Sequence, residues 1–600
     1  MGHTLRRISQ QNLAGAGDRA AGVLGFSNVR SMKFRSFIRP LAIAAGLVLV
    51  LGLALLGRLT LSTPLYLIER GGQTQPMALQ FVPKQSTVVG SVLVRPDRLA
   101  TLWDYLAAPR LRQETRHDQE LIEQALLAST GLSYDRDIRP WLGEEVTAAL
   151  ITPDLDQDPT NGAIPGYLVA LACEDSAAAQ AALELYWQNR AVAGDALTFE
   201  EFLGNRLIYV RQDGQRLGSG DPVQLATVLV ANQYLLAANH PDVLRQALTA
   251  AQSSDLNLQS DRRYKTALKE LPSSRVGLLA LNIPAVNHWL HPDQAEAIGL
   301  GQLGDTDDEV GWGLMSWQLT HQGLMGHAAL LAAQGHQLHP QQAAAGWDAI
   351  VPYLPPSLAV TAAGSDLKSL SQSLKPLLAL AQPAGAEPPL LEGIVDQALG
   401  PGAAALLESG VDRAYGVGLA VAGASTPDWL LVAPQSNILS EALDDLGDLA
   451  RQRGLEVGAL DLRGSPAVAW TRLTLPPSSS LQPLRVVAEV AGLHAQVDQY
   501  EVLATSPATL DAVLHPGDDA RRQLPAWWQQ AGPVPGSSTG YVHIDWPQVQ
   551  TKLAARLPQW RLWSAASQPA LRHLQHITLV SGDRSKSMQT GSILVQLSNH

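Results

Sequence analysis

The sequence predicts an α+β protein in which one N-terminal transmembrane helix precedes two tandem copies of an α+β domain with antiparallel or mixed sheets. Three observations support this prediction. Residues 41–57 are apolar and uncharged, a set of similar segments recurs at a separation of about 265 residues, and several β-type runs follow one another across tight turns. Apolar residues make up 46% and charged residues 16% of the 600-residue chain, so more than one hydrophobic core can form.

The N-terminal segment, residues 1–39, is basic, with seven Lys and Arg residues against the single acid Asp18. From residue 40 onward, 36 basic and 54 acidic residues leave a net charge of −18. Nucleic-acid binding needs a positive groove, so we expect no nucleic-acid partner. The string MKFRSFIRPLAIAAG from Met32 has the form of a complete N-terminus, which makes residues 1–31 a candidate for a misassigned start.

Residues 40–61 are expected to form the transmembrane helix, with the lipid bilayer as their partner. At 1.5 Å per residue the uncharged run covers about 26 Å, and extension past Arg58, whose side chain can snorkel, completes the span. A cleaved signal peptide is the alternative, but its apolar region is shorter and ends at a small-x-small site, which only Thr60 and Ser62 offer.

The orientation of this helix follows from its flanking charges. Basic residues precede the span and few follow it, so we expect a cytoplasmic N-terminus and a body in the periplasm or lumen. Residues 62–77 contain Gly71 and Gly72 and are expected to be a polar linker that holds the body just off the membrane.

The internal similarity predicts repeat 1 at residues 78–335, a linker at 336–348 and repeat 2 at 349–600. The segment 233–248 matches 499–514 with six identities and no gap. Four further pairs keep the same order and are expected to be equivalent. They begin at Phe81 and Tyr353, Trp141 and Ala398, Ser273 and Ser537, and Gly323 and Gln589. Consecutive β runs such as LTFEEFLGNRLIYVRQ from Leu197 predict antiparallel hairpins within each repeat.

The single N-terminal span, the FVP and YLPP segments, the NQYLLAANHPDVLRQAL segment from Asn232 and the duplicated low-charge body together resemble one known family. It is the uncharacterised cyanobacterial membrane-protein family catalogued only as a domain of unknown function. The resemblance implies an anchor in the plasma or thylakoid membrane with the body in the periplasm or lumen, and it implies no catalytic residue.

Several motifs suggest chemistry but fit a structural role better. GLGQLG at residues 299–304 lacks a preceding strand and is followed by acids, which disfavours a dinucleotide site. DLDQDPTNG at 154–162 has Pro159 and Pro165 where a calcium loop needs Gly and Glu. Ser219 in LGSGD lacks the strand-turn-helix frame of a nucleophile elbow.

The histidines and the one cysteine likewise favour structural roles. The pairs His288 with His291 and His336 with His339 each end in His-Pro, a turn signal, and offer too few ligands for zinc. Cys173 is the only cysteine, which rules out an intramolecular disulfide. We therefore assign no catalytic, cofactor-binding or metal-ligating residue and expect no cofactor.

The sequence favours a non-catalytic binding or scaffold protein of a membrane complex, with a ligand or partner held in a cleft between the two domains. A carrier or sensor of an apolar ligand is one alternative, and a hydrolase without a recognisable motif is another. Trp560 and Trp563, spaced i, i+3, would serve as an anchor for a partner if exposed. His240 is expected to be a helix-boundary residue, because its counterpart in the second repeat is Ser506, a favoured N-cap.

Overall fold

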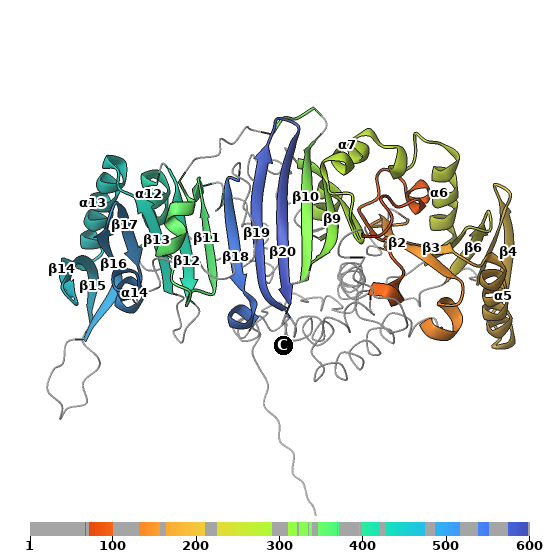
Figure 1. Cartoon of the computed structure of the whole chain (residues 1–600), viewed down its shortest axis with the longest axis horizontal. Helices are drawn as coiled ribbons and strands as arrows, with labels where there is room; N and C mark the ends of the chain where they lie inside the picture. Colours follow the sequence, from red (N-terminus) through yellow and green to blue (C-terminus); the bar gives the residue numbers. More distant parts are fainter. Residues whose placement is uncertain are drawn as a thin grey trace, which may run out of the picture.

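The computed structural model describes residues 67, 71–99, 131–156, 164–210, 225–290, 310–320, 323–333, 335–338, 346–365, 367–368, 370, 395–396, 399–411, 413–420, 428–474, 487–516, 538–550 and 574–597. They form one antiparallel sheet of twenty strands with helices packed on it (Figure 1). The mixed α and β composition and the antiparallel pairing predicted from the hairpin patterns are confirmed.

The strands fall into two sets of ten in chain order. The first set is β1 Val88–Val92, β2 Leu142–Thr152, β3 Gly166–Cys173, β4 Leu197–Phe202, β5 Asn205–Val210, β6 Ala226–Val230, β7 Tyr234–Ala238, β8 Gly277–Asn282, β9 Val310–Thr320 and β10 Gly323–Ala332. The second set is β11 Val360–Gly364, β12 Tyr415–Ala420, β13 Asp428–Pro434, β14 Glu456–Leu462, β15 Ser465–Thr474, β16 Val487–Val497, β17 Tyr500–Ala504, β18 Gly540–Asp545, β19 Leu574–Arg584 and β20 Met588–Leu597.

Both sets follow the same spatial order. In the first half β4, β5, β6, β7, β3, β2, β1, β8, β9 and β10 are successive neighbours. In the second half the same order holds with every strand number raised by ten. The halves join through β10 and β20, so the sheet runs without interruption from β4 to β14.

The junction between β10 and β20 has the geometry of a local twofold axis. Gly326 of β10 lies opposite the β9 residue that pairs with the first residue of β8. Gly591 of β20 lies opposite the β19 residue that pairs with the first residue of β18, so the two glycines hold matching places in the two halves. The residues that follow them, His327 and Ser592, lie opposite each other across the junction. Two antiparallel strands in which a position faces its own counterpart are related by a twofold axis perpendicular to the sheet.

The two predicted repeats, residues 78–335 and 349–600, meet edge to edge in one sheet. Their boundaries as separate domains, and a cleft between them, stay predictions. The physical reason for the edge-to-edge contact is the open edge of β10, whose backbone groups find their partners on β20 over nine residue pairs from Gly323 to Leu331.

Most helices occupy matching places in the two halves. The helices of the first half are α5 Ser176–Val192, α6 Pro241–Gln252, α7 Arg262–Glu270 and α8 Ile283–Leu290, with short turns η1 Ala78–Phe81, η2 Tyr134–Ile138 and η3 Leu258–Ser260. Those of the second are α12 Ala403–Gly410, α13 Asn437–Gln452 and α14 Pro507–Leu514, with the turn η4 Asp348–Tyr353. The pairs η1 and η4, α5 and α13, and α6 and α14 correspond. The described part of the second half has no counterpart of α7.

The helix starts at α6 and α14 confirm the expectation for His240. The ring of His240 accepts a hydrogen bond from the backbone N–H of Asp242, and Pro241 occupies the first turn. The hydroxyl of Ser506 accepts from the N–H of Thr509 in the same way. Both residues are N-caps of a helix that follows a strand.

One expected equivalence is wrong. The segment from Trp141 enters strand β2, whereas the segment from Ala398 leads into helix α12. Strand β2 instead corresponds to β12, because each pairs with the first strand of its half. Small apolar residues such as those of ALGPGAAALL fit a helix and a strand about equally, so the similarity carried no structural information.

The segment expected to be a linker before the body is packed against it where it is described. Leu67 is buried beside Val276 and Leu319. The N–H of Gly72 donates to the carbonyl of Arg275 at 2.7 Å, and a Cβ at Gly72 would lie 2.1 Å from the carbonyl oxygen of Leu93. The close approach of two backbones explains the glycine.

Residues 40–61 lie outside the described residues. Among the helices that the structure does describe, none combines the length and the hydrophobicity that crossing a bilayer requires. The expected linker 336–348 is described in part, and Leu338 and Trp347 there are both buried.

Candidate functional site

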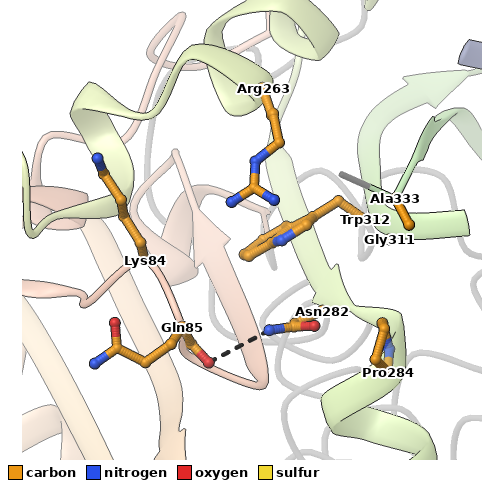
Figure 2. Close-up of a pocket in the computed structure, with 8 residues that line it drawn as sticks. All are labelled: Lys84, Gln85, Arg263, Asn282, Pro284, Gly311, Trp312 and Ala333. Carbon is orange, nitrogen blue, oxygen red and sulfur yellow. Dashed lines mark hydrogen bonds between the residues drawn. The ribbon is translucent and has the colours of Figure 1, made fainter. Parts of the chain in front are cut away.

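A pocket of about 310 Å³ opens at one end of the first half, where β1 begins, β8 ends and β9 begins (Figure 2). Its wall is formed by residues from α7, β8, α8 and β9, from the turn before β1 and from the residue after β10. They are Lys84, Gln85, Arg263, Asn282, Pro284, Gly311, Trp312 and Ala333. The volume is at the lower end of the range for small-molecule sites, so the pocket suits one small ligand.

Two residues with cationic side chains line this pocket from different parts of the chain. Lys84 lies in the turn between η1 and β1, and Arg263 lies in the first turn of α7. The guanidinium carbon of Arg263 lies 5.7 Å from the ring centre of Trp312, within the range of a cation–π interaction. Figure 2 shows the Arg263 guanidinium directed toward Trp312 and the Lys84 ammonium directed away from Arg263 and Asn282. No carboxylate of the described residues forms an ion pair with Lys84.

Asp261 holds Arg263 in place. Its carboxylate caps α7 by accepting from the backbone N–H of Arg263 at 2.7 Å and from that of Tyr264 at 3.3 Å. The same carboxylate also accepts from the Arg263 guanidinium at 3.3 and 3.4 Å. These distances are long for an ion pair, because the carboxylate also binds the two backbone N–H groups. The hydrogen bonds and the Arg263 ion pair keep the pKa of Asp261 below its ordinary value against the opposing effect of burial.

Arg275 fixes the other end of α7. The residue is 3% exposed, and its guanidinium donates to the carbonyls of Pro272 at 2.8 Å and Leu271 at 3.1 Å, which lie just beyond the helix. Burial lowers the pKa of Arg275. Since α7 is anchored at both ends, the place of Arg263 over Trp312 is set by the helix as a whole.

A second cluster brings together a serine, a histidine and an aspartate in the second half. Nε2 of His515 lies 3.4 Å from the hydroxyl oxygen of Ser465, and Nδ1 of His515 lies 3.0 Å from a carboxylate oxygen of Asp511. These are the atoms that a Ser-His-Asp triad uses. The other Asp511 oxygen pairs with Arg463 at 3.2 Å, and the side chains of His515 and Asp511 are 32% and 21% exposed.

Other buried titratable groups have structural roles. Glu145, 1% exposed, accepts hydrogen bonds from the backbone N–H groups of Met77 and Ala78 and from the hydroxyls of Tyr234 and Thr147. Burial raises its pKa in spite of these bonds. The carboxylate therefore ties η1 to β2 and β7.

The structure describes only some of the motif residues considered from the sequence. GLGQLG, His291, His339, Ser219, Trp560 and Trp563 lie outside the described residues, as does most of DLDQDPTNG. The described groups of histidine, cysteine and acidic residues include no set of three that could hold a metal ion. Burial raises the pKa of the Cys173 thiol to about 11, which makes it a poor nucleophile.

Neither cluster was identified from the sequence, and only one carried a signal. Asp511 and His515 are spaced i, i+4, which places both on one face of a helix. Ser465 is 50 residues from His515, and Arg263 is 49 residues from Trp312. The proximity within each pair therefore depends on the pairing of strands and the packing of α7.

Comparison with known proteins gives a family but no activity. The sequence model of a family described as "Protein of unknown function (DUF3352)" matches residues 41–597. Among curated proteins, none matches the chain. Two crystal forms of TP0453 are similar over part of the chain, each at 9% identity. Form I covers 42% of this chain and 77% of its own, with a TM-score of 0.23, and form III covers 44% and 82%, with a TM-score of 0.21.

Proposed function

Since the chain belongs to this family of unknown function, as its resemblance indicated, we propose from its architecture that it is a membrane-anchored, non-catalytic binding protein that serves as an assembly platform. The observation that carries the proposal is the uninterrupted sheet from β4 to β14. A sheet whose two halves share backbone hydrogen bonds holds surfaces at its two ends in a fixed relation, which suits assembly of partners.

The end of the platform at β4 has the character of a partner surface. Among the described strands β4 pairs with β5 alone, and a strand edge of this kind is where another strand can add. Phe199 on β4 is 54% exposed, and Val192 at the end of the neighbouring α5 is 89% exposed. Apolar side chains beside an open strand edge support binding of an extended segment of another protein.

A pull-down of the tagged full chain from native membranes in mild detergent tests the proposal. We expect a membrane protein to be recovered with the wild type and to be largely lost with Phe199→Glu. Lys269→Glu, an exposed change on α7, is the matched control and should retain the partner. Recovery of the wild-type chain alone would count against the platform.

The same proposal places residues 40–61 in the membrane and the body on the extracytoplasmic side. The basic flank of residues 30–39 supports this orientation. Lys586 lies exposed in the turn between β19 and β20. In a Cys173→Ala background, Lys586→Cys should react with a membrane-impermeant maleimide in intact cells. Labelling only after lysis would exclude a periplasmic body and leave a lumenal or a cytoplasmic one.

The Ser465, His515 and Asp511 cluster favours one second candidate, hydrolysis of an ester. The Ser465 hydroxyl would attack the ester carbonyl and pass its proton to Nε2 of His515, which returns it to the leaving alcohol, and water would then release the acyl group. The exposure of His515 and the competing ion pair of Asp511 with Arg463 rank this candidate second. Labelling by a fluorophosphonate that Ser465→Ala abolishes would support it, and an unlabelled wild type would exclude it.

A further inference from the structure

The first-half pocket differs from the corresponding place in the second half in the residues that carry charge. Asn282 lies opposite Trp312 in the pairing of β8 with β9, and Asp545 lies opposite His576 in the pairing of β18 with β19. A carboxylate thus occupies the place of the Asn282 amide. The FVPK and YLPP segments likewise place Pro356 where Lys84 stands. At these two places the described part of the second half carries no cation.

The helix α7 adds further positive charge to the same region. Its sequence RRYKTALKE contains four basic residues and one acid. Arg262, Lys265 and Lys269 are exposed at helical spacing, while Arg263 turns to the pocket. A local excess of cations in a chain of net charge −12 is a positive field that would concentrate anions at this end of the molecule.

We propose that the pocket formed by Lys84, Arg263, Asn282 and Trp312 binds the phosphate group of a phosphate monoester. A phosphate monoester carries a charge of about −1.5 to −2 at neutral pH and three terminal oxygens. Lys84, whose long side chain can rotate toward the pocket, and the Arg263 guanidinium each bring one positive charge, and the Arg263 N–H groups that Asp261 leaves open can donate to two oxygens. The Asn282 amide donates one N–H to the Gln85 carbonyl at 3.5 Å, and its other N–H can donate to the third oxygen. Trp312 and Pro284 provide an apolar wall for the ester group.

The position of the pocket favours a soluble ligand over a lipid of the anchoring membrane. Leu67, the first described residue after the expected span, packs against Val276 and Leu319. Those residues lie at the start of β8 and the end of β9, whereas the pocket is at the end of β8 and the start of β9. The six residues of β8 separate the contact of Leu67 from the pocket. The pocket therefore lies at the opposite end of β8 from the place where the chain enters the body at Leu67.

Calorimetric titration of the detergent-solubilised full chain tests the proposal with three phosphate-bearing probes. They are inorganic phosphate, glycerol 3-phosphate and, separately, vesicles that contain phosphatidic acid. Acetate and phosphatidylcholine vesicles are the references. We expect glycerol 3-phosphate to bind, with a Kd that rises with salt. Binding confined to phosphatidic acid vesicles would identify a lipid as the source of the same phosphate group. Absence of binding to all three probes, or acetate binding as tightly as glycerol 3-phosphate, would overturn the proposal.

Two pocket variants and a matched control locate the site. Lys84→Gln and Arg263→Gln should each raise the Kd about tenfold or more, because each removes one charge-assisted contact. Lys269→Gln removes an equal charge from the exposed face of α7 and should change the Kd by about twofold at most. Lys84→Gln lies outside α7 and guards against misfolding as the cause. An unchanged Kd in both pocket variants would refute the site, whatever the pull-down of the platform shows.

Discussion

The pair His543 and Thr578 makes the stability of the second half depend on pH. His543 of β18 is 3% exposed, and its Nδ1 lies 2.9 Å from the hydroxyl oxygen of Thr578 on β19. The ring also stacks on His576, with 5.2 Å between ring centres. Burial, with a smaller effect of His576, lowers the pKa of His543 to about 3. The folded protein therefore holds this ring neutral where an unfolded chain would protonate it.

The sign and size of the effect follow from proton linkage. Above the ordinary pKa of 6.5, the ring is neutral in both states and the stability is intact. As the pH falls from 6.5 toward 3, only the unfolded chain gains the proton, so the free energy of unfolding decreases. At pH 5 the loss is about 2 kcal/mol, at about 1.4 kcal/mol per pH unit. Burial also lowers the pKa of His576, which acts in the same direction.

The first half supplies the replacement for a test, since Ala280 and Leu314 are paired at the corresponding register of β8 and β9. His543→Ala combined with Thr578→Leu installs that pair. Urea unfolding at pH 7.5 and pH 5.0 should show a pH-dependent loss about 2 kcal/mol smaller in the double variant than in the wild type. Exposed His336→Gln is the control and should behave as the wild type. Equal losses in the wild type and the double variant would refute the linkage.

Three further changes test other features. His240→Ser should alter the free energy of unfolding by about 0.5 kcal/mol at most, because Ser506 is the N-cap at the same place in the other half. Thermal unfolding measures this change, and a larger loss of stability would show that His240 has a role beyond capping. Glu145→Ala should lower the free energy of unfolding in urea by about 3 kcal/mol, since it leaves the buried backbone N–H donors of Met77 and Ala78 without an acceptor. A decrease below about 1 kcal/mol would contradict the structural role of Glu145. Gly323→Ala places a Cβ 2.1 Å from the Val595 carbonyl oxygen at a φ of +144° and should weaken the junction between β10 and β20. Calorimetry should resolve separate unfolding of the two halves, and a single transition at the wild-type temperature would argue against a weakened junction.

The sequence predicted the elements whose signal is local. The caps at His240 and Ser506 and the hairpin from Leu197 to Val210 depend on neighbouring residues, and the structure places them as expected. The repeated order of segments also recurs in the repeated order of strands. The pairing of Trp141 with Ala398 failed because similar composition served a strand in one half and a helix in the other.

The features that depend on tertiary contacts could not be predicted. The edge-to-edge junction requires β10 and β20 to meet in one register, and no local pattern encodes which edges pair. The pocket requires α7 to lie across β9 so that Arg263 reaches Trp312. Cation–π and triad contacts between residues about 50 apart arise only once the sheet is assembled.

The direction of the twofold axis has a consequence for any duplicated site. Because the axis is perpendicular to the sheet, equivalent strands in the two halves run in opposite directions, and Asp545 and His576 lie at the end where β20 finishes. That is also the end at which Leu67 joins the body. A duplicated site would therefore have its two copies at opposite ends of the strands, facing in opposite directions. One copy would lie at the end where Leu67 packs, so the two copies could not both open on the same side of the molecule.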